Sequence, residues 1–318
     1  MHRTSVPAAL TAALGAALVL SSCGGDAPAD AADDAGRLQV AAGFYPYEFL
    51  AERVGGEDVA VTNLTKPGGE PHDLELTPQQ VGALAETDLV VFSAGFQPAV
   101  DEAVEQQAGD RAFDVLGAVE LRDAEQGAHG HEGEEHADEE DADEEHAAGA
   151  DPHVWLDPRR LATIGTALAD RLAELDPDGA AGYRARAQEL DTELTALDEE
   201  LRTGLETCDR RQIVTSHDAF GYLADAYDLE QVPIAGLSPD AEASPRRLRE
   251  VAAQAEAAGV TTVFFEELVS PKVAESLARE VGATAEVLSP LEGPPETGDY
   301  LSAMRENLER LRTALGCA

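Results

Sequence analysis

The chain is poor in cations. Its 318 residues include 22 Lys and Arg but 63 Asp and Glu, which gives a formal net charge of −41 at pH 7. Nucleic-acid binding depends on Lys and Arg meeting phosphates, so this balance excludes nucleic acid as a partner. An acidic surface in a cation-rich medium accounts for most of the charge, which says little by itself about the substrate.

Long apolar runs are also absent, because no segment reaches the roughly 20 residues that a membrane-spanning helix needs. One shorter run, from Pro7 to Leu20, follows Arg3 and leads into Ser21-Ser22-Cys23-Gly24, which is typical of a signal peptide over residues 1–22. Small residues directly before a cysteine resemble the bacterial lipobox, which implies cleavage before Cys23 and diacylation of its sulfur. An ordinary secretory cut nearby is the alternative. We therefore expect an extracytoplasmic protein held at the cell membrane by lipid on Cys23.

Cysteine is scarce, with three in the chain. If lipid takes Cys23, Cys208 and Cys317 remain as an even pair in an oxidising compartment. A disulfide between them would stabilise the C-terminal half by about 4 kcal/mol on the chain-entropy model. Two free buried thiols are the alternative. Because CxxC spacing is absent, we expect a structural bond and neither a metal nor a redox pair.

Residues 126–150 lack aromatic and branched aliphatic side chains altogether. Without apolar area to bury, this stretch should be disordered. It contains four of the eight histidines, His129, His131, His136 and His146. His-rich tracts of this kind suggest auxiliary metal capture, and a plain acidic, solvated loop is the alternative.

Elsewhere short apolar runs alternate with helical patterns. Strands are expected at 38–42, 59–64, 89–92, 213–215, 232–235, 263–265 and 285–288, with helices at 46–54 and 77–86 and helix starts at Ser244-Pro245 and Ser270-Pro271. From Asp176-Pro177, apolar residues recur at spacings of three and four for about seven turns. This pattern favours an interdomain helix over a coiled-coil dimer, so we expect a monomer.

These patterns predict an α/β protein with two lobes, each a mostly parallel sheet covered by helices, joined by a long rigid interdomain helix. The expected organisation is a signal peptide (1–22), a flexible tether (23–36), an N-terminal lobe (37–175), the interdomain helix (176–206) and a C-terminal lobe (207–318).

The three remaining histidines of the mature chain each stand alone where a strand gives way to a helix. His72 lies in a Gly- and Pro-rich loop, His153 precedes a helix start, and His217 follows a strand at the carboxyl end, where open α/β sheets place ligands. A lone histidine is usually structural. Three at such junctions favour a metal site, and neutral imidazole is a good ligand for Zn2+.

Four stretches carry a specific resemblance: Pro71-His72-Asp73-Leu74-Glu75-Leu76-Thr77-Pro78, Asp151-Pro152-His153-Val154-Trp155-Leu156-Asp157-Pro158, Ser216-His217-Asp218-Ala219-Phe220-Gly221-Tyr222 and Val263-Phe264-Phe265-Glu266. They resemble the landmarks of the zinc and manganese substrate-binding lipoproteins of ABC transporters. The resemblance implies capture of Zn2+ between two lobes by His72, His153 and His217 and delivery to an ABC permease and its ATPase. A histidine at 217, where manganese-type members commonly carry a carboxylate, favours zinc over manganese or another divalent metal.

The chain departs from the family pattern at one position. Relatives usually have an aspartate ligand just before a Pro-Leu pair near the C-terminus, but here Ser289 precedes Pro290-Leu291. A neutral hydroxyl is a poor zinc ligand. The candidates for the fourth position are therefore the carboxylates of Glu70, Glu266 and Glu267, or water.

Two other classes of function compete with metal delivery. Three histidines plus water is also a catalytic zinc pattern, with Glu266 as a conceivable general base, but no HExxH motif supports a hydrolase. A surface adhesin or zinc-buffering protein would need only the lipid anchor and the acidic loop. Interface ligands without a nucleophile motif favour binding and delivery, so we expect no enzyme activity.

Overall fold

The computed structural model describes residue 2 and residues 36–122, 150–239 and 241–318. Apart from residues 2 and 36, the expected signal peptide and tether lie outside these residues, as do the histidines at 129, 131, 136 and 146. Residues 36–318 form one compact unit. Within the described residues, no helix is both long enough and apolar enough to cross a membrane.

Two four-stranded sheets, in which all strands pair in parallel, organise this unit. The first has the order β2-β1-β3-β4, with β1 at Leu38–Ala42, β2 at Val59–Asn63, β3 at Leu89–Phe92 and β4 at Ala112–Asp114. The second has the order β6-β5-β7-β8, with β5 at Gln212–Thr215, β6 at Glu230–Pro233, β7 at Thr262–Phe265 and β8 at Thr284–Val287. The predicted α/β class is confirmed.

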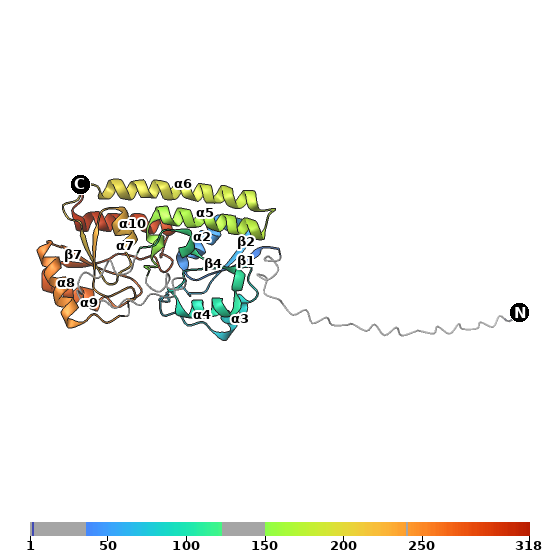
Figure 1. The fold of residues 1–318 in the computed structure, drawn as a ribbon, viewed down its shortest axis with the longest axis horizontal. Helices are drawn as coiled ribbons and strands as arrows, with labels where there is room; N and C mark the ends of the chain where they lie inside the picture. The colour runs from blue at the N-terminus through green and yellow to red at the C-terminus, as the bar shows by residue number, and fades with distance from the viewer. Residues whose placement is uncertain (1, 3–35, 123–149, 240) are drawn as a thin grey trace, which may run out of the picture. The chain divides into compact units, whose positions relative to one another are not determined.

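Helices cover both sheets (Figure 1). They are α2 (Tyr45–Gly55), α3 (Pro78–Leu84), α4 (Pro98–Gln107), α5 (Pro158–Leu175), α6 (Ala180–Leu205), α7 (Gly221–Ala226), α8 (Pro245–Ala257), α9 (Lys272–Val281) and α10 (Tyr300–Leu315). Short 3-10 turns occur at Gly56–Asp58, Gly109–Arg111, Val115–Ala118 and Val154–Leu156.

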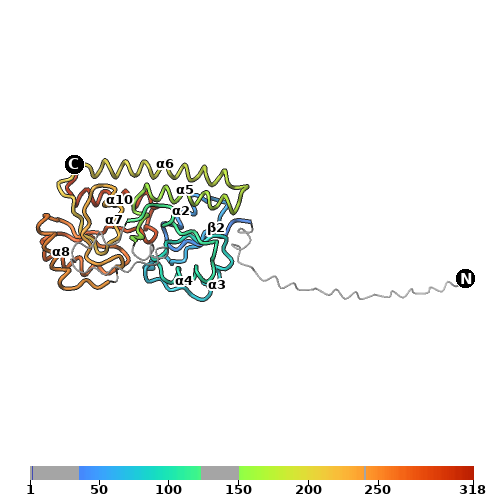
Figure 2. The backbone as a smooth tube through the Cα atoms, in the orientation of Figure 1, coloured from blue at the N-terminus to red at the C-terminus, as the bar shows by residue number. Residues whose placement is uncertain are grey.

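Helix α6 is the long helix that the apolar spacing predicts, and it packs along both lobes (Figure 2). Its apolar stripe is buried: Tyr183, Ala187, Leu190, Leu194, Leu197 and Leu201. On the N-terminal side, Arg53 forms an ion pair of 2.9 Å with Glu193. On the C-terminal side, Arg305 does so with Glu200 at 2.7 Å. The helix begins at Ala180, later than Asp176-Pro177, because residues 177–179 form a turn.

At three expected helix starts a Ser or Thr directly precedes a proline, and at two of them its hydroxyl caps the helix. Thr77 forms a capping box with Gln80, and the Ser244 hydroxyl accepts a hydrogen bond from the backbone of Arg247. The expectation for Ser270-Pro271 was wrong in detail: α9 begins at Lys272, and Pro271 itself holds the cap position with helical backbone angles. The Ser270 hydroxyl therefore does not cap this helix.

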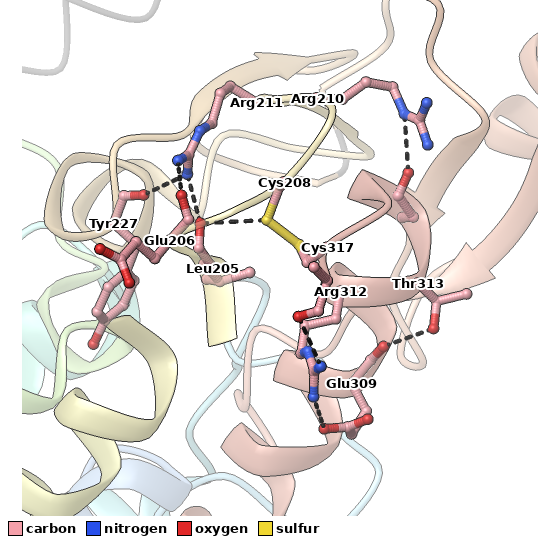
Figure 3. The surroundings of a disulfide bond; sticks show 12 residues. Leu205, Glu206, Cys208, Arg210, Arg211, Tyr227, Glu309, Arg312, Thr313 and Cys317 are labelled. Carbon is pink, nitrogen blue, oxygen red and sulfur yellow. Dashed lines mark hydrogen bonds and ion pairs between the residues drawn. A yellow bond between two sulfur atoms is a disulfide. The ribbon is translucent and has the colours of Figure 1, made fainter. Parts of the chain in front are cut away.

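The predicted disulfide joins Cys208 to Cys317, just beyond the ends of α6 and α10 (Figure 3). Nearby, the guanidinium of Arg211 donates to the carbonyls of Leu205 and Glu206, both at 2.7 Å. These bonds occupy carbonyls that the end of α6 leaves without partners. The disulfide thus fastens α6 to α10.

Candidate metal centre

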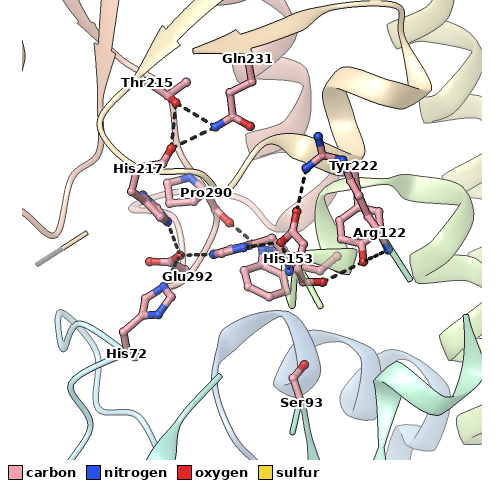
Figure 4. Close-up of polar contacts among 12 residues, drawn as sticks. His72, Ser93, Arg122, His153, Thr215, His217, Tyr222, Gln231, Pro290 and Glu292 are labelled. Atoms are coloured by element: carbon pink, nitrogen blue, oxygen red, sulfur yellow. Dashed lines mark hydrogen bonds and ion pairs between the residues drawn. The ribbon is translucent and has the colours of Figure 1, made fainter. Parts of the chain in front are cut away.

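Three histidines far apart in the sequence converge on one carboxylate, that of Glu292 (Figure 4). His72 comes from the loop between β2 and α3, and His153 directly precedes the 3-10 turn Val154–Leu156. His217 follows β5, and Glu292 lies in the segment between β8 and α10. One potential ligand atom from each residue lies within 4.8 Å of those of the other three.

The sheet topology explains the place of His217. In the order β6-β5-β7-β8, the chain leaves β5 toward β6 and later returns to add β7 on the other side of β5. Open α/β sheets bind ligands at the carboxyl edge at such a switch point. His217 follows β5, and Glu266 directly follows β7, so both lie at this edge. Thr215 and Gln231 fix the His217 carbonyl with hydrogen bonds of 2.8 and 3.0 Å.

The four side chains are buried and their inward-facing atoms lack hydrogen-bond partners. His153 and His217 have no exposed side-chain area, whereas Glu292 is 1% and His72 8% exposed. The Nε2 atoms of all three histidines and both carboxylate oxygens of Glu292 are buried without a hydrogen bond. Buried polar atoms are nearly always satisfied, so a group of unpaired nitrogen and carboxylate atoms indicates a binding site for a cation.

The spacing of these atoms fits a metal better than it fits direct hydrogen bonds. Glu292 Oε1 lies 3.4 Å from His72 Nε2, 3.6 Å from His217 Nε2 and 3.9 Å from His153 Nε2. Hydrogen bonds between such groups are usually shorter, at about 2.7–2.9 Å. Ligand atoms around a tetrahedral zinc ion with bonds of 2.0–2.1 Å stand about 3.3 Å apart. A small contraction would therefore bring three nitrogens and one oxygen into a zinc sphere.

Two further carboxylates each contact the Nδ1 atom of one histidine ring. His153 Nδ1 lies 2.8 Å from Asp151 Oδ1, and His217 Nδ1 lies 2.5 Å from Glu266 Oε1. The Ser216 hydroxyl also donates to Glu266 Oε1. Because a carboxylate accepts from the Nδ1 proton, each ring presents the lone pair of Nε2 to the centre, the usual support for metal-binding histidines.

Burial and charge oppose each other in this cluster. Burial lowers the pKa of His153, which keeps this ring neutral. Burial also disfavours a charged His217, but Glu266 and Glu292 outweigh it and raise its pKa to about 10. For Glu292, burial acts to raise the pKa, yet His217 and His72 hold it well below the usual range. Without a metal, His217 therefore carries a proton that balances Glu292, and a dication would replace it.

Trp155 ties the histidine segment of one lobe to the glutamate segment of the other. Its indole N–H donates to the carbonyl of Pro290 at 2.7 Å, and the Tyr300 hydroxyl donates to the Trp155 carbonyl at 2.6 Å. Trp155 and Tyr300 are buried, and so is Pro290 in the turn before Glu292. The distance between His153 and Glu292 is therefore fixed by direct contacts between the lobes.

Ser289 does not lie in the cluster, in which Glu292 stands beside the three histidines. Its backbone N–H donates to the Asn307 side chain at 3.0 Å, and Asn307 donates to its carbonyl at 2.7 Å. Its hydroxyl accepts from the N–H of Leu291, which has a left-handed φ of 59°. Ser289 thus shapes the turn that presents Glu292.

None of the three glutamates considered from the sequence takes the fourth place. Glu70 accepts hydrogen bonds from the backbone N–H groups of His72 and Asp73, and Glu266 supports His217. Glu267 is exposed. Glu292 is not among the sequence candidates because the family pattern places the acid just before a Pro-Leu pair, whereas here the acid comes immediately after Pro290-Leu291.

The fold and site define a two-lobed binding protein with a metal centre between its lobes, and comparison with known proteins agrees. The family model described as "Zinc-uptake complex component A periplasmic" matches residues 40–314. The chain belongs to this family, which is one of transport binding proteins and not an enzyme family.

Individual relatives support this assignment. The high-affinity zinc uptake system protein ZnuA of Bacillus subtilis is 36% identical over 306 residues, which cover 94% of each chain. The zinc-binding protein AdcA of Streptococcus pyogenes is 34% identical over 87% of this chain, but the match spans only 56% of AdcA.

Solved structures show the same fold. A crystal structure of ZnuA has a TM-score of 0.73 and 28% identity, and the match covers 87% of this chain and 99% of that one. A mutant structure of the laminin-binding adhesin Lmb of Streptococcus agalactiae has a TM-score of 0.76 and 29% identity, with coverage of 87% and 99%.

Proposed function

We propose that this protein captures Zn2+ with His72, His153, His217 and Glu292 and delivers it to an ABC-type importer made of a permease and an ATPase. The observation that carries the proposal is the convergence of three buried imidazole nitrogens and one buried carboxylate, all without hydrogen-bond partners. Family membership supports the transport role.

The set of donor atoms favours zinc over manganese. Three imidazole nitrogens and one carboxylate oxygen make a compact four-coordinate set, which suits zinc. Manganese prefers carboxylate, carbonyl and water oxygens in an octahedral arrangement. A manganese site would need further oxygen ligands, whereas Asp151 Oδ1 and Glu266 Oε1 face the Nδ1 atoms of His153 and His217.

The same arrangement argues against zinc catalysis. A catalytic zinc site has three protein ligands and an open position for water or substrate, whereas here Glu292 supplies a fourth protein ligand. Glu266, the conceivable general base, accepts from His217 Nδ1 and from Ser216. We therefore propose a binding protein without enzyme activity.

We further propose that the protein is a monomer in the extracytoplasmic space, anchored by lipid on Cys23. The lipobox-like sequence supports the anchor, and the relative from Streptococcus pneumoniae serotype 4 is named a zinc-binding lipoprotein. In cells, Cys23→Ala should move the protein from the membrane fraction to the soluble or culture fraction. Membrane retention equal to that of the wild type would refute the anchor.

Metal analysis and competition titration test the site directly. The purified protein should bind Zn2+ tightly, and His217→Ala should weaken that binding by at least about tenfold. His146→Ala, a matched histidine substitution in the acidic stretch, should leave the tight site unchanged. Equal affinities for the wild type and His217→Ala, with both proteins folded by circular dichroism, would contradict the proposed site.

A further inference from the structure

A cavity of about 540 Å3 adjoins the metal centre. Its lining includes Glu292 and also Gly68, from the loop that carries His72. The rest of the lining comes from the C-terminal lobe, including the segment between β8 and α10. Because the four ligand side chains are almost completely buried, an ion needs such a space to reach them from solvent.

The cavity wall carries an excess of negative charge. Its ionisable residues are Glu266, Glu267, Glu292, Glu296, Glu306 and Arg310. Arg310 is paired with Glu306 at 2.5 Å, so the other four carboxylates have no cationic side chain in the lining to balance them. Walls of one charge around a cleft concentrate ions of the opposite sign.

Two of these carboxylates have oxygen atoms without partners. Glu266 is 2% exposed, and while its Oε1 accepts from His217 and Ser216, its Oε2 is buried without a hydrogen bond. Glu292 Oε2 is also unpaired. An unpaired buried carboxylate oxygen is unfavourable unless water or a cation solvates it. The deep wall of the cavity therefore has free acceptors of its own.

We propose that this cavity is an entry chamber in which carboxylates hold a hydrated divalent cation before it reaches the three imidazoles. This inference rests on the proposed capture of zinc at the buried centre. Glu267 and Glu296 are exposed and attract the ion from solvent, whereas Glu266 Oε2 and Glu292 Oε2 receive it inside. Glu292 both lines the cavity and belongs to the metal centre, so the ion can exchange water for protein ligands in steps.

Oxygen-only coordination has a consequence for selectivity. Carboxylates and water suit hard cations such as Ca2+ and Mg2+ as well as Zn2+, whereas the histidines of the centre select zinc. The chamber should accordingly be shared by divalent cations that the centre does not retain. Calcium should then compete with zinc for entry without competing for the final site.

The chain contains its own reporter for the rate of capture. Trp155 is the only tryptophan, and its ring lies 5.1 Å from that of His153. Stopped-flow measurement of its fluorescence should follow Zn2+ arriving at the centre. The test variant is Glu267→Gln with Glu296→Gln. Its matched control is Glu256→Gln with Glu280→Gln, two exposed glutamates outside the cavity that give the same change in net charge.

We expect the test variant to capture Zn2+ at least about threefold more slowly than the control at low ionic strength, without faster release. Equal rates in the two variants would overturn the chamber, because net charge alone would then account for steering. Faster release from the test variant would also count against it, since it would indicate damage to the centre. A wild type without tight equilibrium binding would instead refute the proposed function.

A second measurement identifies the occupant of the chamber. Millimolar Ca2+ should slow zinc capture by the wild type more than NaCl does at equal ionic strength, and the test variant should lose this difference. If Ca2+ and NaCl act alike on the wild type, the cavity holds water only and the proposal fails.

Discussion

At the scale of single residues, the carboxylates of the site differ in role because they face different nitrogens of the histidine rings. Glu292 faces Nε2 of all three histidines, at distances suited to sharing a metal. Asp151 and Glu266 face Nδ1 of His153 and His217 at hydrogen-bond distance. Glu292 therefore adds negative charge to the ligand set. Asp151 and Glu266 instead fix the orientation of the rings that supply the ligand nitrogens.

This difference leads to a prediction for two neighbouring residues. Glu292→Gln should weaken Zn2+ binding by at least about tenfold, because it removes the negative charge in direct reach of the ion. Ser289→Ala should change affinity much less, since Ser289 supports the turn through its backbone and one hydrogen bond to Leu291. Competition titration with a chelator measures both. Greater damage from Ser289→Ala than from Glu292→Gln would refute the assignment of the fourth ligand.

The sequence pointed to the histidines but not to the glutamate for a physical reason. Among eight histidines, those outside the leader and the acidic stretch could be counted and their local contexts compared. Among 63 acidic residues, no single glutamate stands out by number or spacing. Its selection depends on the left-handed turn at Leu291 and on Asn307 holding Ser289, which are contacts of the folded chain.

At the scale of elements, Arg122 connects the segment after the first sheet to α7 of the second lobe. Its guanidinium contacts Asp225 at 2.8 Å and Asp151 at 3.4 Å, and its backbone N–H donates to the Tyr222 hydroxyl at 2.9 Å. A Cβ on Gly221 would lie only 2.0 Å from this guanidinium, so the contact requires glycine there. Asp151 in turn holds the ring of His153.

Replacing Arg122 should therefore weaken the site from a distance. Arg122→Gln should lower zinc affinity by several-fold, within the range that supporting residues of metal ligands show, and Arg122→Lys should restore part of it. Nitrogen NMR of His153 should also show a weakened Nδ1–H bond to Asp151. Arg184→Gln, which breaks the exposed pair with Asp170, serves as the control. An unchanged His153 signal in Arg122→Gln would contradict this role.

Elements with a strong local signal were predictable, and short ones were not. The caps at Thr77 and Ser244 and the seven expected strands follow from turn chemistry and short apolar runs. Strand β4 offers no such run, because it has only three residues, Ala112–Asp114. The helix start at Asp157-Pro158 was recognised, but not the extent of α5. Helix α10 was missed altogether, although both helices carry apolar residues at spacings of three and four.

At the scale of the whole described unit, α6 and the disulfide hold the lobes without touching the metal centre. The disulfide closes a loop of 109 residues between Cys208 and Cys317. Replacing both cysteines with serine should reduce the free energy of unfolding by about 4 kcal/mol, as loop-closure entropy suggests. Thermal unfolding of the zinc-free protein measures this loss, and zinc affinity should stay near that of the wild type. A large loss of affinity in the folded double variant would show that the bond also shapes the site.

Deletion of the His-rich stretch, residues 126–150, tests whether the tight zinc site depends on it. His72, His153 and His217 all lie outside residues 126–150, and Asp151 N donates to Arg122 O at 3.0 Å, so the ends of the segment between them already meet. Three residues, 123–125, can bridge that gap after the deletion.

The shortened protein should keep one tight zinc site and lose only weak ones, because a chain that must be ordered to bind an ion binds it loosely. Titration by calorimetry should count the sites before and after deletion, with His217→Ala in both backgrounds as the control. Disappearance of the tight site on deletion alone would mean that the stretch supplies a ligand to the centre.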